Sequence, residues 1–227
     1  MEYRFRSASV SKIASSINTD DVNQIINSPF NPLISDEGFS LLSNNSDKLF
    51  CFQYLREVPI TYGEYNNGYC KRTEKVIRET NFQLDLENKM MIIFSGKKQS
   101  DFLLKRLSNI FGISFYVLEI DFQKLLNLLT NSKFIVRSEQ AVINGFNYGD
   151  LMVGKYIANI KDKEILLSVI AKYGKKVEKI KLSLESYDGN TSSITIHKNG
   201  SFLFKNCRKD NIDIIIHFVH HIDSGDL

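Results

Sequence analysis

The stretch from residue 71 to residue 94 is the feature that most constrains the fold of this 227-residue chain. Polar and apolar side chains alternate along it, and Phe82 and Leu84 mark the apolar side. A polar turn at residues 87–89 leads into a second apolar run at residues 90–94. Alternation with a period of two is typical of a strand that buries one face, and a short turn joins antiparallel neighbours. The segment therefore predicts an antiparallel hairpin that packs one face against a core.

Helical and strand periodicities alternate along the rest of the chain. Leu103 and Leu107 belong to an apolar stripe with a spacing of about 3.6 residues, which predicts an amphipathic helix after the hairpin. The same spacing predicts helices from Thr19 and at 122–129, 163–173 and 211–222, with Gly174 as a C-cap. Strands are predicted at 49–55, 115–118, 133–143, 152–160, 179–185, 194–196 and 202–204, and a loop at 62–69. We therefore expect an α+β fold, with a largely antiparallel sheet and packed helices.

Two segments of the chain share one pattern. Residues 76–111 and 180–222 each run through strand, polar turn, apolar strand, short basic connector and amphipathic helix. A duplication would divide the chain into two pseudo-repeated strand–strand–helix halves, an N-terminal α+β half at 1–112 and a C-terminal α+β half at 113–227. The alternative is one continuous domain, because a meander followed by a packing helix is a common way to cover one face of an antiparallel sheet.

Composition excludes several classes of protein. The chain is 43% hydrophobic and 24% charged with 12 Gly and 3 Pro, which excludes collagen-like, mucin-like and long disordered chains. Its longest apolar runs are about five residues, far short of the ~20 that cross a bilayer, so we expect a soluble protein without a membrane partner. The cysteines, Cys51, Cys70 and Cys207, are odd in number without CxxC spacing, and the N-terminus shows no apolar signal core. We therefore expect a cytoplasmic location.

Basic residues are concentrated in one part of the C-terminal half. The formal net charge is +3, which is too small to predict a polyanionic partner by itself. Residues 151–209, however, hold 12 basic and 5 acidic side chains, a local excess of +7. Residues 1–150 hold 17 of each sign, and residues 210–227 hold four Asp and no Lys or Arg. This distribution predicts a basic surface on the C-terminal half.

We interpret the basic stretch as a surface that binds the phosphates of a nucleic acid, with an affinity that falls as salt rises. Two tyrosines lie among the basic residues, and aromatic rings of this kind stack the bases of single strands. Lysine outnumbers arginine, which argues against base-specific readout and leaves DNA and RNA both open. The candidate residues are Lys172, Tyr173, Lys175, Lys176, Lys179, Lys181, Tyr187, Lys198, Lys205, Arg208 and Lys209. The alternative is a solvated, lysine-rich surface without a ligand.

The leading hypothesis is therefore a non-enzymatic nucleic-acid-binding protein, with a role in phage-related defence or genome maintenance. A second hypothesis is a scaffold or sensor subunit that acts through protein–protein contacts. The expected loop at 62–69 is rich in Tyr and Asn, which suits a recognition surface, and an edge strand can pair with a partner or with a second copy.

A third hypothesis is a metal-dependent nuclease. Asp85, Glu87 and Lys89 have the D-x-E-x-K order in which two carboxylates hold a divalent ion and a lysine positions water. The same residues suit a plain hairpin turn, with Asp85 and Glu87 on the outward face. His217 and His221 lie four apart on an expected helix, a spacing that suits zinc and equally suits a helix C-terminus.

Sequence motifs of the common enzyme classes are missing. The chain has no P-loop, no GxGxxG and no GxSxG. We therefore predict no catalytic residue, no metal ligand and no cofactor.

Overall fold

The computed structural model describes residues 6–14, 17, 19–46, 48–65, 69–131, 134–148, 152–186, 189, 191–207 and 219. The chain divides into two compact units. One, which we call the hairpin unit, comprises Ile13–Phe94 and Lys98–Phe115. The other, which we call the lysine unit, comprises Met1–Lys12, Ser95–Lys97 and Tyr116–Leu227. The expected halves at 1–112 and 113–227 remain a prediction.

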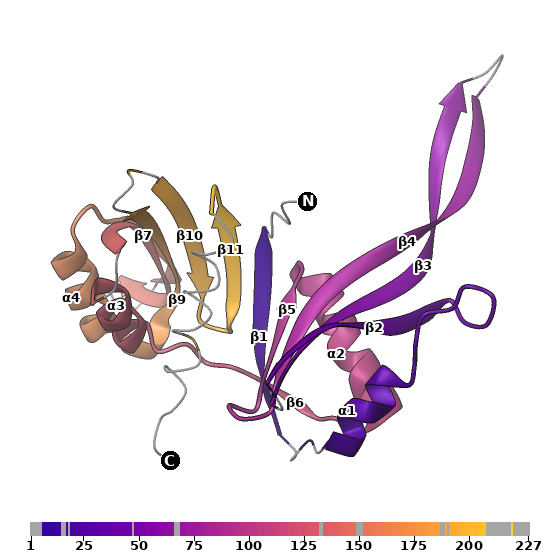
Figure 1. The fold of residues 1–227 in the computed structure, drawn as a ribbon. Helices are drawn as coiled ribbons and strands as arrows, with labels where there is room; N and C mark the ends of the chain where they lie inside the picture. The colour runs from indigo at the N-terminus through magenta and orange to yellow at the C-terminus, as the bar shows by residue number, and fades with distance from the viewer. Residues whose placement is uncertain are drawn as a thin grey trace. The chain divides into compact units, whose positions relative to one another are not determined.

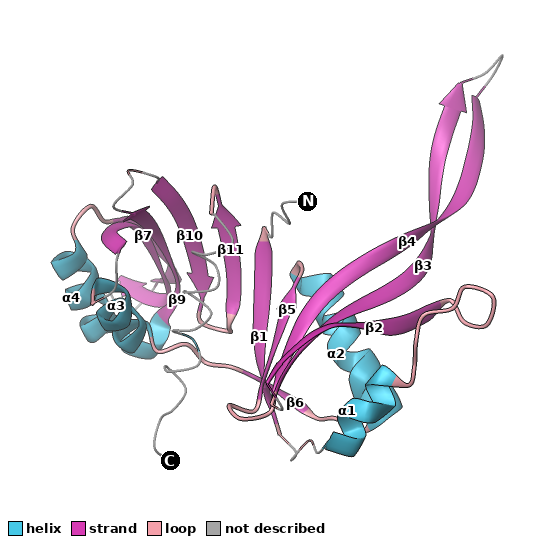
Figure 2. Ribbon diagram, in the orientation of Figure 1, coloured by secondary structure: helices cyan, strands magenta, loops and turns pink. Residues whose placement is uncertain are grey.

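The hairpin unit is an antiparallel meander with two helices (Figures 1 and 2). Its strands lie in the order of the sequence, and every pair is antiparallel. The elements are α1 (Thr19–Ile26), β2 (Glu37–Ser46), β3 (Leu49–Tyr65), β4 (Tyr69–Asp85), β5 (Met90–Phe94) and α2 (Lys97–Phe111). The hairpin predicted at 71–94 is thus confirmed as β4 and β5, with Leu84 opposite Met91.

The core of the hairpin unit lies between one face of this meander and the two helices. Phe52 and Phe82 face each other across β3 and β4 with ring centroids 5.2 Å apart. Leu103 and Leu107 of α2 pack on this aromatic layer, and both are buried. The predicted helical stripe therefore faces the core, because residues three and four apart lie on one side of a helix.

β3 and β4 extend well beyond the rest of their sheet (Figure 1). β2 pairs with β3 only as far as Arg56, and β5 pairs with β4 only from Asn81 onward. Residues 57–65 of β3 and 69–77 of β4 therefore form a two-stranded ribbon, which we call the ribbon, about 30 Å long. The loop predicted at 62–69 is wrong for residues 62–65 and 69, which belong to β3 and β4.

Cross-strand contacts explain why the ribbon continues where a loop was expected. The hydroxyl oxygens of Thr61 and Thr73 lie 2.8 Å apart, and Tyr62 lies opposite Arg72. Arg72 pairs with Glu64 of the facing strand at 3.6 Å. β-branched and aromatic cross-strand pairs stabilise a sheet, and these pairs outweigh the turn preference of Gly63.

The lysine unit contains antiparallel strands in the order β1-β11-β10-β9-β7-β8. Its strands are β1 (Ser7–Ile13), β7 (Phe134–Tyr148), β8 (Met152–Asn159), β9 (Val177–Ser186), β10 (Thr191–His197) and β11 (Ser201–Lys205). A short strand, β6 (Phe115–Val117), lies between α2 and α3 in the chain.

The helices of the lysine unit begin and end as their sequences predict. α3 (Phe122–Thr130) begins at Asp121, whose carboxylate accepts hydrogen bonds from the amides of Gln123 and Lys124. α4 (Lys163–Tyr173) is capped in the same way by Asp162. Gly174 ends α4 with a φ of 49° and opens the 3-10 turn η1 (Gly174–Lys176), so the predicted C-cap is confirmed.

The α+β class and the antiparallel sheet are confirmed among the described residues. The pseudo-repeat is not confirmed, since the strands at 180–205 form a three-stranded meander and the helix expected at 211–222 lies outside the described residues apart from the buried Val219. In the part of the chain that is described, no helix is long and apolar enough to span a membrane.

Candidate nucleic-acid interface

The sheet of the lysine unit has one buried row and one polar row on its central strands. Ile180 and Leu182 of β9 are buried and alternate with Lys179 and Lys181 on the opposite face. β10 and β11 repeat the pattern, so their polar residues lie on the same face as the lysines. We call this surface the polar face; it carries Ser7, Ser9, Lys179, Lys181, Ser183, Ser193, Thr195, His197, Ser201, Leu203 and Lys205.

Four of the predicted lysines gather around the start of β9. Lys179 lies opposite His197 in the register of β9 and β10. Lys198 follows directly, and its Nζ donates a hydrogen bond of 3.1 Å to the carbonyl oxygen of Lys175. Lys176 follows Lys175 in the chain. The fold thus brings a helix end, a strand and a turn together into one cluster, which we call the lysine cluster: Lys175, Lys176, Lys179 and Lys198.

Several basic side chains already have a partner. Lys181 pairs with Glu139 at 2.5 Å and Lys198 with Glu119 at 3.9 Å. The Nζ of Lys176 donates to the carbonyl oxygen of Gly145 at 3.2 Å. Lys175, Lys179 and Lys205 make no side-chain hydrogen bond or ion pair with any other described residue. Among the described residues, the charges of these three lysines are therefore not offset by an ion pair.

His197 lies among several cations at this end of the polar face. Its side chain is half-buried. Burial and then the charge of Lys179 lower the pKa of His197 below its ordinary value. Lys155 and Lys97 act in the same direction, while Glu178 opposes them. Lys97 and Lys155 were not among the predicted residues, because nothing in their local sequence indicates that they lie near His197.

The remaining candidate residues are placed less favourably or lie outside the described residues. Lys205 is exposed on β11, opposite Ser193 and away from the lysine cluster. Tyr173 is half-buried, and the Nζ of Lys172 lies 5.5 Å from the centroid of its ring, so this ring is not an open stacking surface. Tyr187, Arg208 and Lys209 lie outside the described residues.

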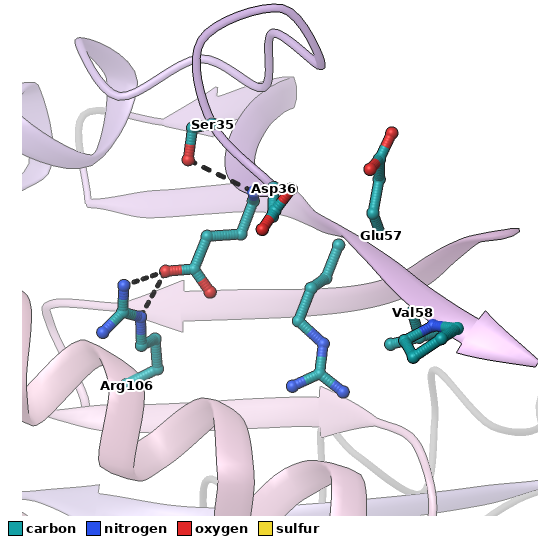
Figure 3. A pocket seen from close by; sticks show the side chains of 8 residues that line it. Ser35, Asp36, Glu57, Val58 and Arg106 are labelled. Atoms are coloured by element: carbon teal, nitrogen blue, oxygen red, sulfur yellow. Dashed lines mark hydrogen bonds and ion pairs between the residues drawn. The ribbon is translucent and has the colours of Figure 1, made fainter. Parts of the chain in front are cut away.

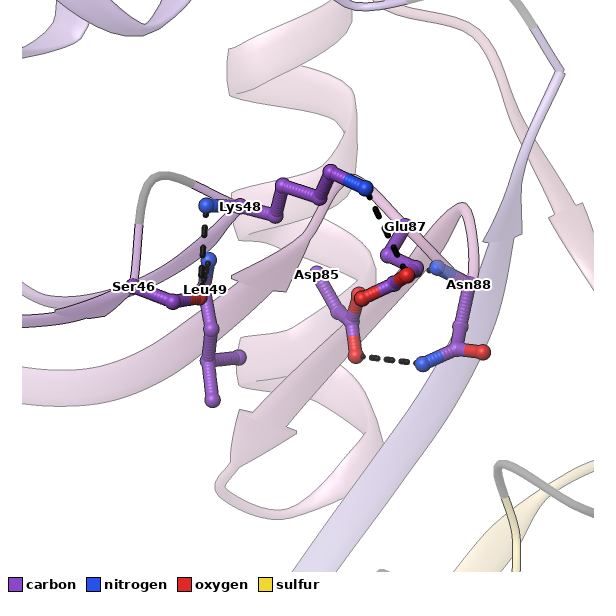
Figure 4. A network of polar contacts seen from close by, with 6 residues as sticks. All are labelled: Ser46, Lys48, Leu49, Asp85, Glu87 and Asn88. Carbon is purple, nitrogen blue, oxygen red and sulfur yellow. Dashed lines mark hydrogen bonds and ion pairs between the residues drawn. The ribbon is translucent and has the colours of Figure 1, made fainter.

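The D-x-E-x-K residues form a turn between β4 and β5 (Figure 4). Asp85 accepts hydrogen bonds from the backbone amide and the side-chain amide of Asn88, at 2.9 and 2.8 Å. Glu87 turns toward Lys48 instead, with 3.4 Å between their charged atoms. Asp85 is buried, which corrects the expected outward position. Its carboxylate is engaged in fixing the turn, and Lys89 completes the turn with a φ of 50°.

Metal ligation finds no support in the described part of the chain, where no group of three or more His, Cys, Asp or Glu side chains is placed to hold an ion. His217 and His221 lie outside the described residues. The nuclease hypothesis therefore remains a hypothesis, because the described residues place no third metal ligand beside Asp85 and Glu87.

Comparison with known proteins adds no family. The sequence matches no model of a known protein family, and no curated protein matches it significantly.

Proposed function

We propose that this protein binds nucleic acid through the lysine cluster and the adjoining polar face. The observation that carries the proposal is the setting of His197. Cations from four separate parts of the chain act on or adjoin this one residue, namely Lys97, Lys155, the segment 175–179 and Lys198. Such a concentration of positive charge attracts a polyanion, and the hydroxyl groups of the polar face supply further hydrogen bonds to phosphate oxygens.

The composition of this surface favours contacts with the backbone of a nucleic acid rather than with its bases. The cations are lysines, which act as point charges, whereas arginine is the usual partner of guanine. Among the described residues, Lys175 and Lys179 have no competing carboxylate, while Lys181 must exchange Glu139 for a phosphate. Binding is therefore sequence-tolerant and depends strongly on salt, because each phosphate contact releases counterions. A role in phage-related defence or genome maintenance, in the cytoplasm, is part of this proposal.

The test is fluorescence anisotropy with labelled single- and double-stranded DNA and RNA, at roughly 50 and 200 mM salt. The informative variant combines Lys175→Glu with Lys179→Glu. Its matched control combines Lys71→Glu with Lys105→Glu, two exposed lysines of the hairpin unit, with the same change in net charge. We expect the first pair to weaken binding and to reduce the slope of log affinity against log salt by about 2, and the control to retain both.

Two results contradict the proposal. If no nucleic acid binds at the lower salt, the polar face is not a phosphate-binding surface. If both double variants lose affinity equally, net charge and not the lysine cluster governs binding.

A second candidate function, a subunit that works through protein–protein contacts, is favoured by the ribbon. A two-stranded hairpin is marginally stable in water unless something packs on it. The ribbon nevertheless exposes apolar and aromatic side chains, with Tyr65 86% and Tyr69 67% exposed at its described end. Analytical ultracentrifugation measures the association of the protein with itself or with a protein partner, and its salt dependence distinguishes the two functions. Contacts through the ribbon survive high salt and are lost in Tyr65→Ala with Tyr69→Ala, whereas phosphate binding is lost at high salt.

A further inference from the structure

An open pocket of about 540 Å³ lies at the base of the ribbon in the hairpin unit (Figure 3). It is formed where the chain enters β2, where the ribbon leaves the sheet, and where α2 crosses the same face. Charged side chains dominate its lining, beside the apolar edge of Val58 and Pro59. The lining residues are Ser35, Asp36, Glu37, Arg56, Glu57, Val58, Pro59 and Arg106.

All three acidic side chains of the pocket already have a cationic partner. Lys75 pairs with Glu57 at 2.8 Å and with Asp36 at 3.6 Å. Arg106 pairs with Glu37, which also accepts a hydrogen bond of 2.5 Å from the hydroxyl of Tyr54. The dashed lines in Figure 3 show the bonds that Arg106 makes. Two cations therefore serve the three carboxylates, and one of the two, Lys75, lies outside the lining.

Arg56 is the one cation of the lining that has no anionic partner among the described residues. Its Nε is buried and donates no hydrogen bond there. In the strand register, Arg56 lies between Glu37 of β2 and Arg78 of β4, and Glu37 is already engaged by Arg106 and Tyr54. A buried donor without an acceptor is unfavourable. Among the described residues, the guanidinium of Arg56 is thus the charged group of the lining that still lacks a partner.

Packing holds the Arg56 side chain in place. Its guanidinium carbon lies 4.0 Å from the centroid of the Phe102 ring on α2. A guanidinium that stacks on an aromatic ring keeps its N–H groups in the plane parallel to that ring, so they remain available to a ligand at its edge. Because the side chain is already ordered, binding loses little conformational entropy.

We propose that this pocket binds a small ligand through an oxyanion, a carboxylate or a phosphate, that pairs with Arg56. Both groups match the planar N–H fork of arginine, whose terminal N–H groups lie at its edge. The volume suits a ligand of metabolite size. No residue of the lysine cluster lines the pocket, so this proposal and the proposed nucleic-acid interface are tested independently of each other.

The experiment measures thermal stabilisation and calorimetric binding of the full chain with two probes, inorganic phosphate and succinate. We expect at least one of them to bind the wild-type protein, and the stronger of the two identifies the source of the oxyanion. Arg56→Met is expected to lose roughly 10- to 100-fold in affinity. Lys105→Met, which removes an exposed cation from the same helix as Phe102, is the control and retains binding.

A second variant and the melting temperature keep the result from being confused with unfolding. Methionine can pack on Phe102 and removes the unpaired donor. Without a probe, the Arg56→Met protein should therefore melt no lower than the wild type. Arg56→Lys retains the charge and loses the planar fork, so we expect intermediate binding. The proposal is overturned if neither probe binds, if Arg56→Met binds as the wild type does, or if only a peptide carboxylate binds, which would assign the pocket to a protein partner.

Discussion

His197 of β10 lies directly opposite Lys179 of β9, and this pairing places a half-buried imidazole beside a cation on the polar face. Burial and that neighbouring charge both disfavour the imidazolium, so the pKa of His197 is lowered. The histidine is therefore neutral at pH 7, and its titration responds to whatever anion approaches the lysine cluster.

The first prediction concerns this titration. Phosphates bound beside Lys179 bring negative charge to the imidazole, so the pKa of His197 should rise when an oligonucleotide binds. By linkage, the affinity for the oligonucleotide should increase as the pH falls below about 6.5. An NMR titration of the histidine ring signals, with and without the oligonucleotide, measures the shift.

The same measurement has an internal control. After burial, the charge of Lys179 is the largest cause of the lowered pKa of His197. Lys179→Gln removes this charge and should raise the pKa of His197 in the free protein. In the free wild-type protein, the neutral imidazole contributes stability that is present above about pH 6.5 and is lost as the pH falls through the lowered pKa. A pKa that stays constant while the oligonucleotide binds would show that binding occurs elsewhere.

The second prediction concerns Glu37, which accepts hydrogen bonds from Tyr54 and Arg106. Burial raises the pKa of Tyr54, and the hydrogen bond and charge of Glu37 raise it further. Glu37→Ala should lower the free energy of unfolding by about 1–3 kcal/mol, because it leaves the buried Tyr54 hydroxyl without an acceptor. Tyr54→Phe should cost about 1 kcal/mol.

Urea unfolding measures both effects. Glu87→Ala, which breaks an exposed ion pair with Lys48, is the control and should cost under about 1 kcal/mol. Equal losses for Glu37→Ala and Glu87→Ala would contradict a structural role for the Glu37 contacts.

The third prediction concerns Gly38 at the start of β2. A Cβ built there would lie 2.3 Å from both the backbone nitrogen and the Cα of Phe30. Backbone atoms cannot move aside as a flexible side chain does, so Gly38→Ala should destabilise the protein by about 3 kcal/mol. Gly154→Ala, at a strand position with open space around it, should have little effect in the same thermal melts. A Gly38→Ala protein as stable as the control would refute this close approach.

The fourth prediction compares two cysteines. Cys70 is exposed on the ribbon, whereas Cys207 is half-buried, and burial raises the pKa of its thiol. The thiolate is the reactive form, so iodoacetamide should modify Cys70 faster than Cys207. Mass spectrometry of the folded protein over time distinguishes the two sites, and Cys70→Ser assigns the fast phase. Faster modification of Cys207 would show that its surroundings open in solution.

The fold was predictable where the periodicity is local and strong. The stripe that contains Leu103 and Leu107 predicts α2, and the alternation at 71–94 predicts β4 and β5. β2 was missed, because its Ser and Asn residues favour turns and its pairing with β3, which sets Phe39 opposite Tyr54, makes it a strand. The expected loop at 62–69 failed for the same reason, since cross-strand pairs outweighed local turn preference.

By itself, the sequence determined the α+β class and the concentration of lysine at residues 151–209, because both depend on local spacing and composition. The tertiary structure alone shows that Lys97 and Lys155 act on His197, and that Arg56 stacks on Phe102 with no acceptor for its Nε among the described residues. These contacts join residues far apart in the chain. They depend on strand register and helix packing, which the spacing of residues within a single segment does not specify.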